Sequence, residues 1–339
     1  KPRVGLRATR PSRLGLRRAS RARSSAMLGR LLSRTSMAPF GSPGIRRCLS
    51  RAAKTRRPAP LPVGIPASVN KEAAVDLPTL LAFERRGHVC MRGFLDRNEM
   101  TAISNVVHAA IDESAAAEHA DTLKGQQREK QPFLQTFNPH RTCSKVLGLA
   151  TSKRLASTAH RLLFDGEPAK GNLRLYQTAI FVKRPGHDET TWHMDLGTAP
   201  METNHMATVW LPLQAVPAPR NGGTALVFAR GSHRDVSGAV YETMHADVVV
   251  SDRYAIEDHG ALEVGDCTWH HGWTLHAANA FKCGEARVAF TATYVSADAR
   301  ALPAHTAESF EDEDRPSYAA WVDDVTPGAV LDHALLPLV

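Results

Sequence analysis

Apolar and polar positions alternate over short distances through the second half of the chain. From residue 172 onwards, short apolar or alternating runs are separated by Gly, Pro, Asn and Asp, which is typical of strands joined by turns. No long helical pattern intervenes, so we expect an antiparallel sandwich or barrel. The expected strands lie in NLRLYQTAIFVKRPG, HMATVWLPLQAV, GGTALVFARGSH, DVVVSD, ALEVGDCTWHHG and ARVAFTATYV.

The residues before this strand region follow a helical period. Residues 76 to 113 predict a helix, a short strand and a second helix. Asp96, with Glu99 three residues later, resembles a capping box at the start of the second helix. The polar residues 114 to 132 predict a loop or frayed helix, and Cys143 to Leu163 has the apolar spacing of a helix packed on a sheet.

Charge is distributed very unevenly along the 339 residues. Residues 1 to 57 hold 17 of the 42 Lys and Arg residues and no Asp or Glu, because the first acidic residue is Glu72. The remainder has 25 basic and 34 acidic residues, a net charge of −9. The overall charge of +8 therefore does not indicate a nucleic-acid-binding face on the folded part.

The basic leader has the composition of an organellar transit peptide, since it is rich in Arg, Ser and Ala and lacks acids. This predicts delivery to the mitochondrial matrix or to a plastid. The alternative is a disordered basic arm that binds nucleic acid or an anionic membrane, and binding that persists in a chain beginning near Val63 would support it. Met27 is an alternative start, in which case residues 1 to 26 are not native protein.

The composition divides the chain into a leader and one domain. Residues 1–62 are expected to be transit peptide and Pro-rich linker, and residues 63–339 a single domain. Its expected parts are N-terminal helices over 70–165, a β core over 170–300, and an acidic C-terminal segment over 301–339. We expect the tail around Glu308 to Asp324, with its embedded aromatic residues, to form a loop and helix packed on the barrel.

Two further classes of protein are excluded. No run of 18 apolar residues exists, so the sequence predicts no membrane span. The five cysteines are scattered, odd in number and form no CxxC motif, which argues against a disulfide framework and against a thiolate zinc site.

Within the strand region, the stretch TWHMDLG places His193 and Asp195 two residues apart. Residues i and i+2 of a strand point to the same face, so this pair could hold one metal ion. The triplet alone is weak, because a chain with 16 His and 34 acidic residues contains such triplets by chance. The others are His119/Asp121, His187/Glu189, His233/Asp235 and His245/Asp247.

A second histidine on another strand would complete a two-histidine, one-carboxylate facial triad, the ligand set of non-haem Fe(II) oxygenases. The segment GDCTWHHGWTLHAAN offers His270, His271 and His276 in a strand-turn-strand context. Arg287 stands eleven residues beyond His276 inside an apolar run, where its burial would require an anionic partner such as a carboxylate ligand.

In the order and spacing of these motifs, roughly residues 76 to 300 resemble the phytanoyl-CoA dioxygenase family of Fe(II)/2-oxoglutarate oxygenases. The shared pieces include FERRGHVCMRGFL, the turn Lys183-Arg184-Pro185-Gly186, the His-x-Asp pair and VWLPL. After these come Asn221-Gly222-Gly223-Thr224, Gly231-Ser232-His233-Arg234, and the series Gly-Asp, His, Asn and Arg. Where family members often have Gln between His and Asp, this chain has Met194.

The resemblance implies a mainly β fold with flanking helices, built on a double-stranded β-helix (jelly-roll, cupin-like) core. It implies that His193, Asp195 and His276 bind Fe(II) and that Arg287 pairs with the distal carboxylate of 2-oxoglutarate. Trp210 and Gln177 would line the cosubstrate pocket. The implied reaction oxidises a small-molecule or acyl substrate with O2, releases succinate and CO2, and uses ascorbate as reductant.

Three alternatives stay open from the sequence. His270 or His271 could replace His276 as third ligand, although we expect both to lie before the turn, one facing the pocket and the other facing outside. His276 could be a satisfied core histidine, although Arg287 would then be unexplained. The chain could also be a catalytically inactive metal-binding jelly-roll protein that acts as a sensor or scaffold.

Overall fold

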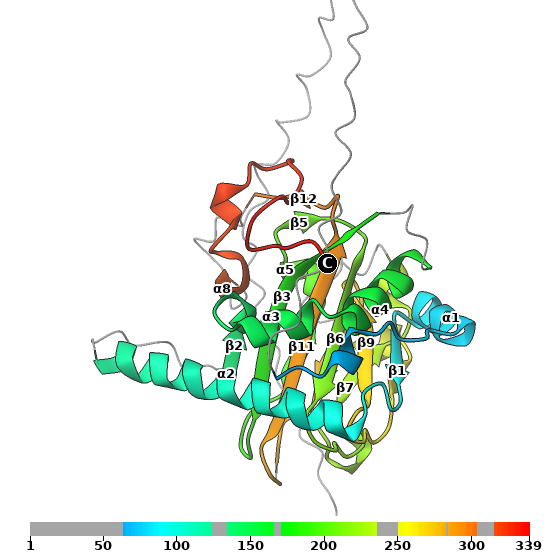
Figure 1. Cartoon of the computed structure of the whole chain (residues 1–339). Helices are drawn as coiled ribbons and strands as arrows, with labels where there is room; N and C mark the ends of the chain where they lie inside the picture. The colour runs from blue at the N-terminus through cyan, green and yellow to red at the C-terminus, as the bar shows by residue number, and fades with distance from the viewer. Residues whose placement is uncertain (1–63, 124–133, 166–170, 236–249, 283, 304–314) are drawn as a thin grey trace, which may run out of the picture. The chain divides into compact units, whose positions relative to one another are not determined.

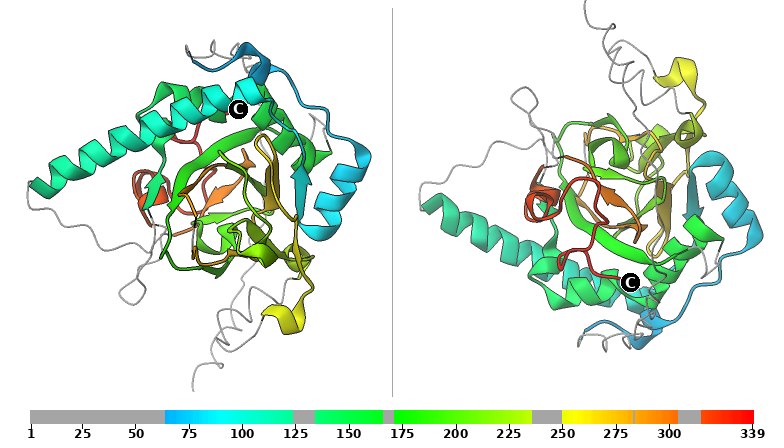
Figure 2. Two further views of the ribbon diagram at one scale, coloured as in Figure 1. Left: turned by 90° about the horizontal axis from the view of Figure 1, so that it is seen from below. Right: turned by 90° about the horizontal axis from the view of Figure 1, so that it is seen from above.

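The computed structural model describes residues 64–123, 134–165, 171–235, 250–282, 284–303 and 315–339, which belong to one unit. The predicted leader over 1–62 lies outside the described residues. The strands within them form a six-stranded sheet in the order β1-β9-β6-β11-β3-β2 and a four-stranded sheet in the order β4-β10-β7-β8, both antiparallel. A short pair, β12-β5, completes the set. Seen end-on, the two sheets enclose a barrel (Figure 2).

The large sheet is built from β1 (His88–Met91), β2 (Leu134–Phe137), β3 (Leu173–Lys183), β6 (Met206–Pro212), β9 (Cys267–His271) and β11 (Arg287–Ser296). The small sheet is built from β4 (Thr190–His193), β7 (Leu226–Ala229), β8 (Ile256–Asp258) and β10 (His276–Ala278). The short pair is β5 (Met201–Glu202) and β12 (Arg300–Ala301). Five of the six predicted strand segments are confirmed.

The helices are α1 (Leu77–Arg86), α2 (Arg97–Leu123), α3 (Ser144–Ala150), α4 (Lys153–Phe164), α5 (Asp195–Thr198), α7 (Val250–Arg253) and α8 (Arg315–Tyr318). Helices α2, α3 and α4 cover the outer face of the large sheet (Figure 1). No described helix has the length and apolar character required to span a membrane.

The alternation of side chains along the long strands separates an outer apolar face from an inner polar one. On β6, Ala207, Val209 and Leu211 join the main core against the helices. The residues between them, Thr208 and Trp210, face the interior. The same alternation holds on β9, β11 and β3. The residues of these strands that face the interior are Thr268, His270, Arg287, Ala289, Thr291, Thr293, Gln177, Ala179, Phe181 and Lys183.

Local sequence signals account for the turn that leads into β1. Asp76 caps α1 by accepting the backbone N–H of Thr79 at 2.9 Å. The helix ends at Gly87, whose φ of 82° is the left-handed conformation that glycine adopts without strain. A Cβ at Gly87 would lie 2.4 Å from Oγ1 of Thr274, so the strand region also requires glycine here.

The capping box predicted at the start of α2 is present. The backbone N–H of Glu99 donates to Oδ1 of Asp96 at 2.8 Å, and the N–H of Asp96 donates to Oε2 of Glu99 at 2.9 Å. Replacing Asp96 by Ala is expected to lower the free energy of unfolding by about 1 kcal/mol, because it leaves a helical N–H without its partner. Urea unfolding would measure the change. Asp112→Ala, an exposed site within the same helix, is the control, and an equal loss in both variants would contradict the capping role.

Residues 114 to 132 were predicted as a loop or frayed helix, and they are helical as far as Leu123, while residues 124–133 lie outside the described residues. Two other local predictions differ from the structure. The single helix expected over Cys143 to Leu163 is two helices, α3 and α4, separated at Thr151 and Ser152. The strand expected in DVVVSD is wrong where it is described, because Val250 to Arg253 form one helical turn, and residues 247–249 lie outside the described residues.

The C-terminal tail packs as predicted where it is described. Tyr318 and Trp321 are fully buried in a cluster with Tyr176 of β3 and Leu196 of α5. Phe310, the third aromatic residue of the tail, lies outside the described residues. The tail thereby supports α5, the helical turn that begins at Asp195.

Candidate metal centre

The two histidines predicted as ligands lie on adjacent strands, and the predicted aspartate follows one of these strands. His193 ends β4 and is the direct cross-strand partner of His276 at the start of β10. The sequence predicted Asp195 on the same strand as His193, but Asp195 is the first residue of α5. The intervening Met194 keeps extended backbone angles (φ −123°, ψ 128°), so His193 and Asp195 still project to the same side.

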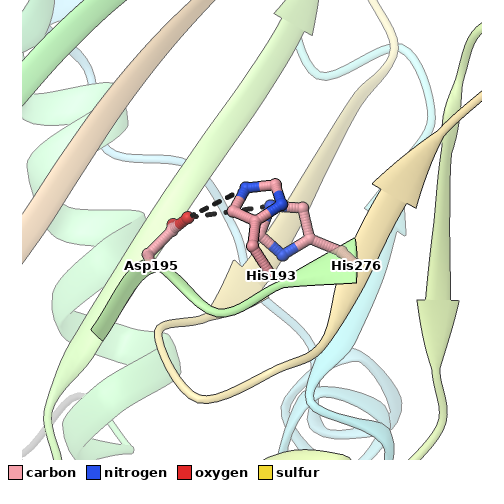
Figure 3. A group of neighbouring side chains, drawn as sticks. All are labelled: His193, Asp195 and His276. Atoms are coloured by element: carbon pink, nitrogen blue, oxygen red, sulfur yellow. Dashed lines mark ion pairs between the residues drawn. The ribbon is translucent and has the colours of Figure 1, made fainter. Parts of the chain in front are cut away.

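The three side chains converge on one point. Nε2 of His276 lies 3.6 Å and Nε2 of His193 lies 3.9 Å from Oδ1 of Asp195 (Figure 3). One ligand atom from each residue lies within 4.8 Å of the other two. In the described part of the chain this is the group of His, Cys, Asp and Glu side chains whose spacing suits a metal ion.

Backbone hydrogen bonds orient both imidazoles. Nδ1 of His193 donates to the carbonyl of Thr191 at 2.8 Å, and Nδ1 of His276 donates to the carbonyl of Thr274 at 2.9 Å. With the proton held on Nδ1, the lone pair of each Nε2 faces the shared point, which is the arrangement found in metal-ligating histidines.

The ionisation of His276 and Asp195 suits metal binding. Burial, followed by the neighbouring His193 and His270, lowers the pKa of His276 well below its ordinary value, so this imidazole is neutral. Burial alone would raise the pKa of Asp195. The hydrogen bond from His270, with the electrostatic interactions of His270, His276 and His193, instead holds that pKa well below its usual range. A carboxylate and neutral imidazoles are the protonation states that ligation requires.

The second oxygen of Asp195 is bound by residues of the large sheet. Oδ2 accepts the hydroxyl of Thr208 at 2.6 Å and lies 3.2 Å from Nε2 of His270. His270 therefore faces the site, whereas its neighbour His271 turns outwards and donates from Nε2 to the carbonyl of Asn204 at 2.8 Å. Neither of these two histidines belongs to the group that converges on the metal point.

Arg287 lies in the interior of the same barrel and is 4% exposed. Its guanidinium carbon is 5.2 Å from the centroid of Trp210, and Trp210 is two residues, or about 7 Å, along β6 from Thr208. Burial lowers the pKa of Arg287 to about 10, so it remains cationic at neutral pH. Among the described residues no carboxylate lies within ion-pair distance of it, and a small dicarboxylate reaching from the metal point would supply one.

The loop before β7 fixes the guanidinium. Nε of Arg287 donates to Oγ1 of Thr224 at 3.1 Å. The preceding Gly223 is packed so closely that a Cβ would lie 1.7 Å from the carbonyl oxygen of Pro217. Asn279 donates to the carbonyl of Gly223 at 3.3 Å and accepts from Nζ of the buried Lys183 at 3.2 Å.

Lys183 is the direct cross-strand partner of Arg287 and is fully buried. Burial, and next the charge of Arg287, lower the pKa of Lys183 to about 8. Sequence reasoning placed Lys183 only in the turn after β3. The signal for its inward position was the alternation along NLRLYQTAIFVK, which puts Lys183 on the same face as Gln177.

The two residues expected to line the cosubstrate pocket both face the interior. Trp210 is 3% exposed and lies beneath the guanidinium of Arg287. Gln177 is half-buried on β3 and is paired with Thr293, whose hydroxyl lies 3.0 Å from that of Thr208. Their assignment to a cosubstrate stays a prediction.

The other His-x-acid triplets lie away from this point where they are described. His187 accepts the backbone N–H of Arg184 at 3.1 Å in the turn after β3. His233 donates to the carbonyl of Glu84 at 2.9 Å, which ties its loop to α1. His245 lies outside the described residues.

A cavity of about 850 Å³ opens beside His193. Its apolar wall includes Trp192, Met194, Leu196, Met201 and Trp273. Its polar wall includes Glu202, Asn204, His205, Asp298 and Arg300. A cavity of this size beside the candidate ligands has the dimensions of a small-molecule site.

A model of the family described as phytanoyl-CoA dioxygenase (PhyH) matches residues 83–289, more than half of the chain. The chain belongs to this family. A comparison with curated protein sequences found no significant match.

Solved structures of related enzymes have the same fold. A non-heme alpha ketoglutarate dependent carbocyclase, SnoK from nogalamycin biosynthesis, aligns with a TM-score of 0.58 at 20% identity, covering 78% of this chain and 96% of SnoK. The epimerase SnoN of the same biosynthesis aligns with a TM-score of 0.54 at 25% identity, covering 76% of this chain and 96% of SnoN. EctD from S. alaskensis with 2-oxoglutarate and 5-hydroxyectoine aligns with a TM-score of 0.55 at 16% identity, covering 79% of this chain and 90% of EctD. The predicted cupin-like jelly-roll core with flanking helices is confirmed.

Proposed function

We propose that this member of the phytanoyl-CoA dioxygenase family is a non-haem Fe(II)- and 2-oxoglutarate-dependent dioxygenase that hydroxylates a small-molecule or acyl substrate. The convergence of His193, Asp195 and His276 on one point carries the proposal. The SnoK and EctD structures support it, since SnoK is an alpha ketoglutarate dependent enzyme and EctD was solved with 2-oxoglutarate bound.

The residues present fit the iron and the cosubstrate. Two imidazoles and one carboxylate would hold Fe(II) on one side and leave its other positions open. The bound iron would supply the activation of O2 that is coupled to oxidation of 2-oxoglutarate to succinate and CO2, and ascorbate would keep it reduced.

The residues of the chain itself would hold the ligands, orient the cosubstrate and exclude water. Backbone carbonyls fix the two imidazoles, and Thr224 fixes the guanidinium of Arg287 for the distal carboxylate of 2-oxoglutarate. Trp210 and the inward residues of β3 and β11 shield that ion pair from water, which strengthens it.

The substrate would enter the cavity beside His193. Trp192 and Trp273 offer broad apolar faces to a ring or alkyl body, and Glu202, Asp298 and Arg300 offer charges of both signs at the other wall. We therefore propose a substrate with an apolar body and a polar end.

Succinate release is the test. The purified chain with Fe(II), ascorbate and 2-oxoglutarate is expected to release succinate slowly alone and faster when a screen reaches a substrate, and a chelator should abolish both. Metal binding without succinate in any of these mixtures would contradict the proposal and favour the inactive sensor or scaffold.

A further inference from the structure

The two oxygens of Asp195 have different surroundings. Oδ1 is directed at Nε2 of His193 and Nε2 of His276, where a metal would lie. Oδ2 is bound instead by two residues of the large sheet, Thr208 and His270. The carboxylate is therefore held in an orientation in which one oxygen faces the metal point.

Thr208 has a single hydroxyl proton, and its partners show where that proton lies. Its oxygen is 2.6 Å from Oδ2 of Asp195 and 3.0 Å from the hydroxyl of Thr293. A carboxylate can only accept, so Thr208 donates to Asp195 and accepts from Thr293. This hydrogen-bond chain ties the carboxylate to the centre of the large sheet.

His270 is the second donor, and its surroundings restrict what it can do. Its side chain is 2% exposed, its Nε2 lies 3.2 Å from Oδ2 of Asp195, and its Nδ1 is buried with no hydrogen-bond partner among the described residues. The tautomer that satisfies the carboxylate carries the proton on Nε2. The ring centroid is also 4.2 Å from that of His276, so His270 contacts two of the three candidate ligands.

We propose that His270 is a positioning residue whose Nε2–H, together with the hydroxyl of Thr208, holds Oδ2 of Asp195 so that the carboxylate binds metal through Oδ1 alone. The inference rests on the proposed function. Binding through both oxygens would occupy one of the positions that the cosubstrate and O2 need. Side chains that orient a ligand in this way typically change metal affinity by roughly 10- to 100-fold when they are removed.

Cobalt(II) provides a readout separate from turnover, because its visible ligand-field spectrum reports affinity and coordination number together. His270→Phe keeps a ring and removes the donor, and it is expected to weaken Co(II) binding by roughly 10- to 100-fold and to change the spectrum. His270→Gln places an amide N–H near the position of Nε2 and is expected to restore most of the affinity and the wild-type spectrum. His160→Phe, at a half-buried histidine of α4 that bonds the carbonyl of Gly171, is the matched control and should change neither.

Thr208→Val supplies a second route if His270→Phe does not fold. It removes the other donor to Oδ2 at nearly constant volume and is expected to weaken Co(II) binding in the same direction. Wild-type affinity and spectrum in His270→Phe, or equal losses in His270→Phe and His270→Gln, would overturn the positioning role.

The same experiment separates this inference from the proposed function. If the wild-type chain binds Co(II) and the His270 variants behave as expected, but Fe(II) yields no succinate, the proposed function fails and the positioning role stands. If succinate forms and His270→Phe binds Co(II) like the wild type, the positioning role fails and the function stands.

Discussion

Replacement of His193 by alanine is expected to abolish the formation of succinate from 2-oxoglutarate. His193 offers Nε2 to the point shared by Oδ1 of Asp195 and Nε2 of His276, and a facial triad that loses one of its three ligands no longer holds iron in a defined geometry. The exposed edge of His193 lines the cavity, so the substitution leaves the core intact. Succinate release and bound iron per chain are the quantities to measure.

His187→Ala is the matched control, since His187 also belongs to a His-x-acid triplet. Its Nδ1 accepts a backbone N–H in the turn after β3, and it is not part of the converging group. Succinate formation and iron content should stay near those of the wild type. Full activity in His193→Ala would contradict the role of the triad in binding iron.

Arg287→Ala is expected to raise the 2-oxoglutarate concentration needed for half-maximal rate, with little change in the rate at saturation. Removing one partner of a buried, hydrogen-bonded charge pair costs about 2–5 kcal/mol. Since each 1.4 kcal/mol is tenfold in affinity, the required concentration should rise between about 30-fold and about 3,000-fold. Steady-state succinate release as a function of 2-oxoglutarate concentration would measure it.

Arg184→Ala tests whether this effect belongs to the buried cation or to positive charge in general. Arg184 follows Lys183 in the chain and is exposed, with its backbone N–H bonded to His187. Its loss should leave the 2-oxoglutarate requirement unchanged. An unchanged requirement in Arg287→Ala would mean that another residue binds the distal carboxylate.

The sequence contained enough information for the barrel because its long strands are buried on one face against helices and lined on the other by polar or small residues. The alternation along β6 and β11 is a local property, and it correctly separates Val209 from Trp210 and Phe290 from Arg287. The capping box at Asp96 is equally local, since its partners are three residues apart.

Predictions that depended on distant contacts were less successful. The run of Val before Asp252 has the composition of a strand, yet Val250 to Arg253 form a helical turn in which Arg253 bonds Asp235 at 2.7 Å. The polar stretch after residue 114, predicted as a loop or frayed helix, continues α2 to Leu123. Local preference is a weak guide to such short or polar segments, because tertiary context overrides it.

Local motifs predicted some residues of the candidate site, whereas others could be assigned only from contacts between distant segments. The His-x-Asp spacing pointed to His193 and Asp195, which do converge, because this motif lies within a single segment. The role of Thr208 could not be read from the sequence, since a threonine in a strand is common and its partner Asp195 lies on another element. The choice between His270 and His276 likewise required the three-dimensional positions of their imidazoles.

Anaerobic addition of 2-oxoglutarate to the Fe(II)-loaded chain tests whether the triad and Arg287 form one site for iron and 2-oxoglutarate. Chelation of Fe(II) by the 2-oxo acid produces a visible metal-to-ligand charge-transfer band that requires both molecules in one site, and it needs no knowledge of the substrate. We predict that the wild-type chain develops this band, that His276→Ala does not, and that Arg287→Ala develops it only at much higher 2-oxoglutarate concentration. A wild-type chain that binds Fe(II) and shows no band at any 2-oxoglutarate concentration would contradict the account.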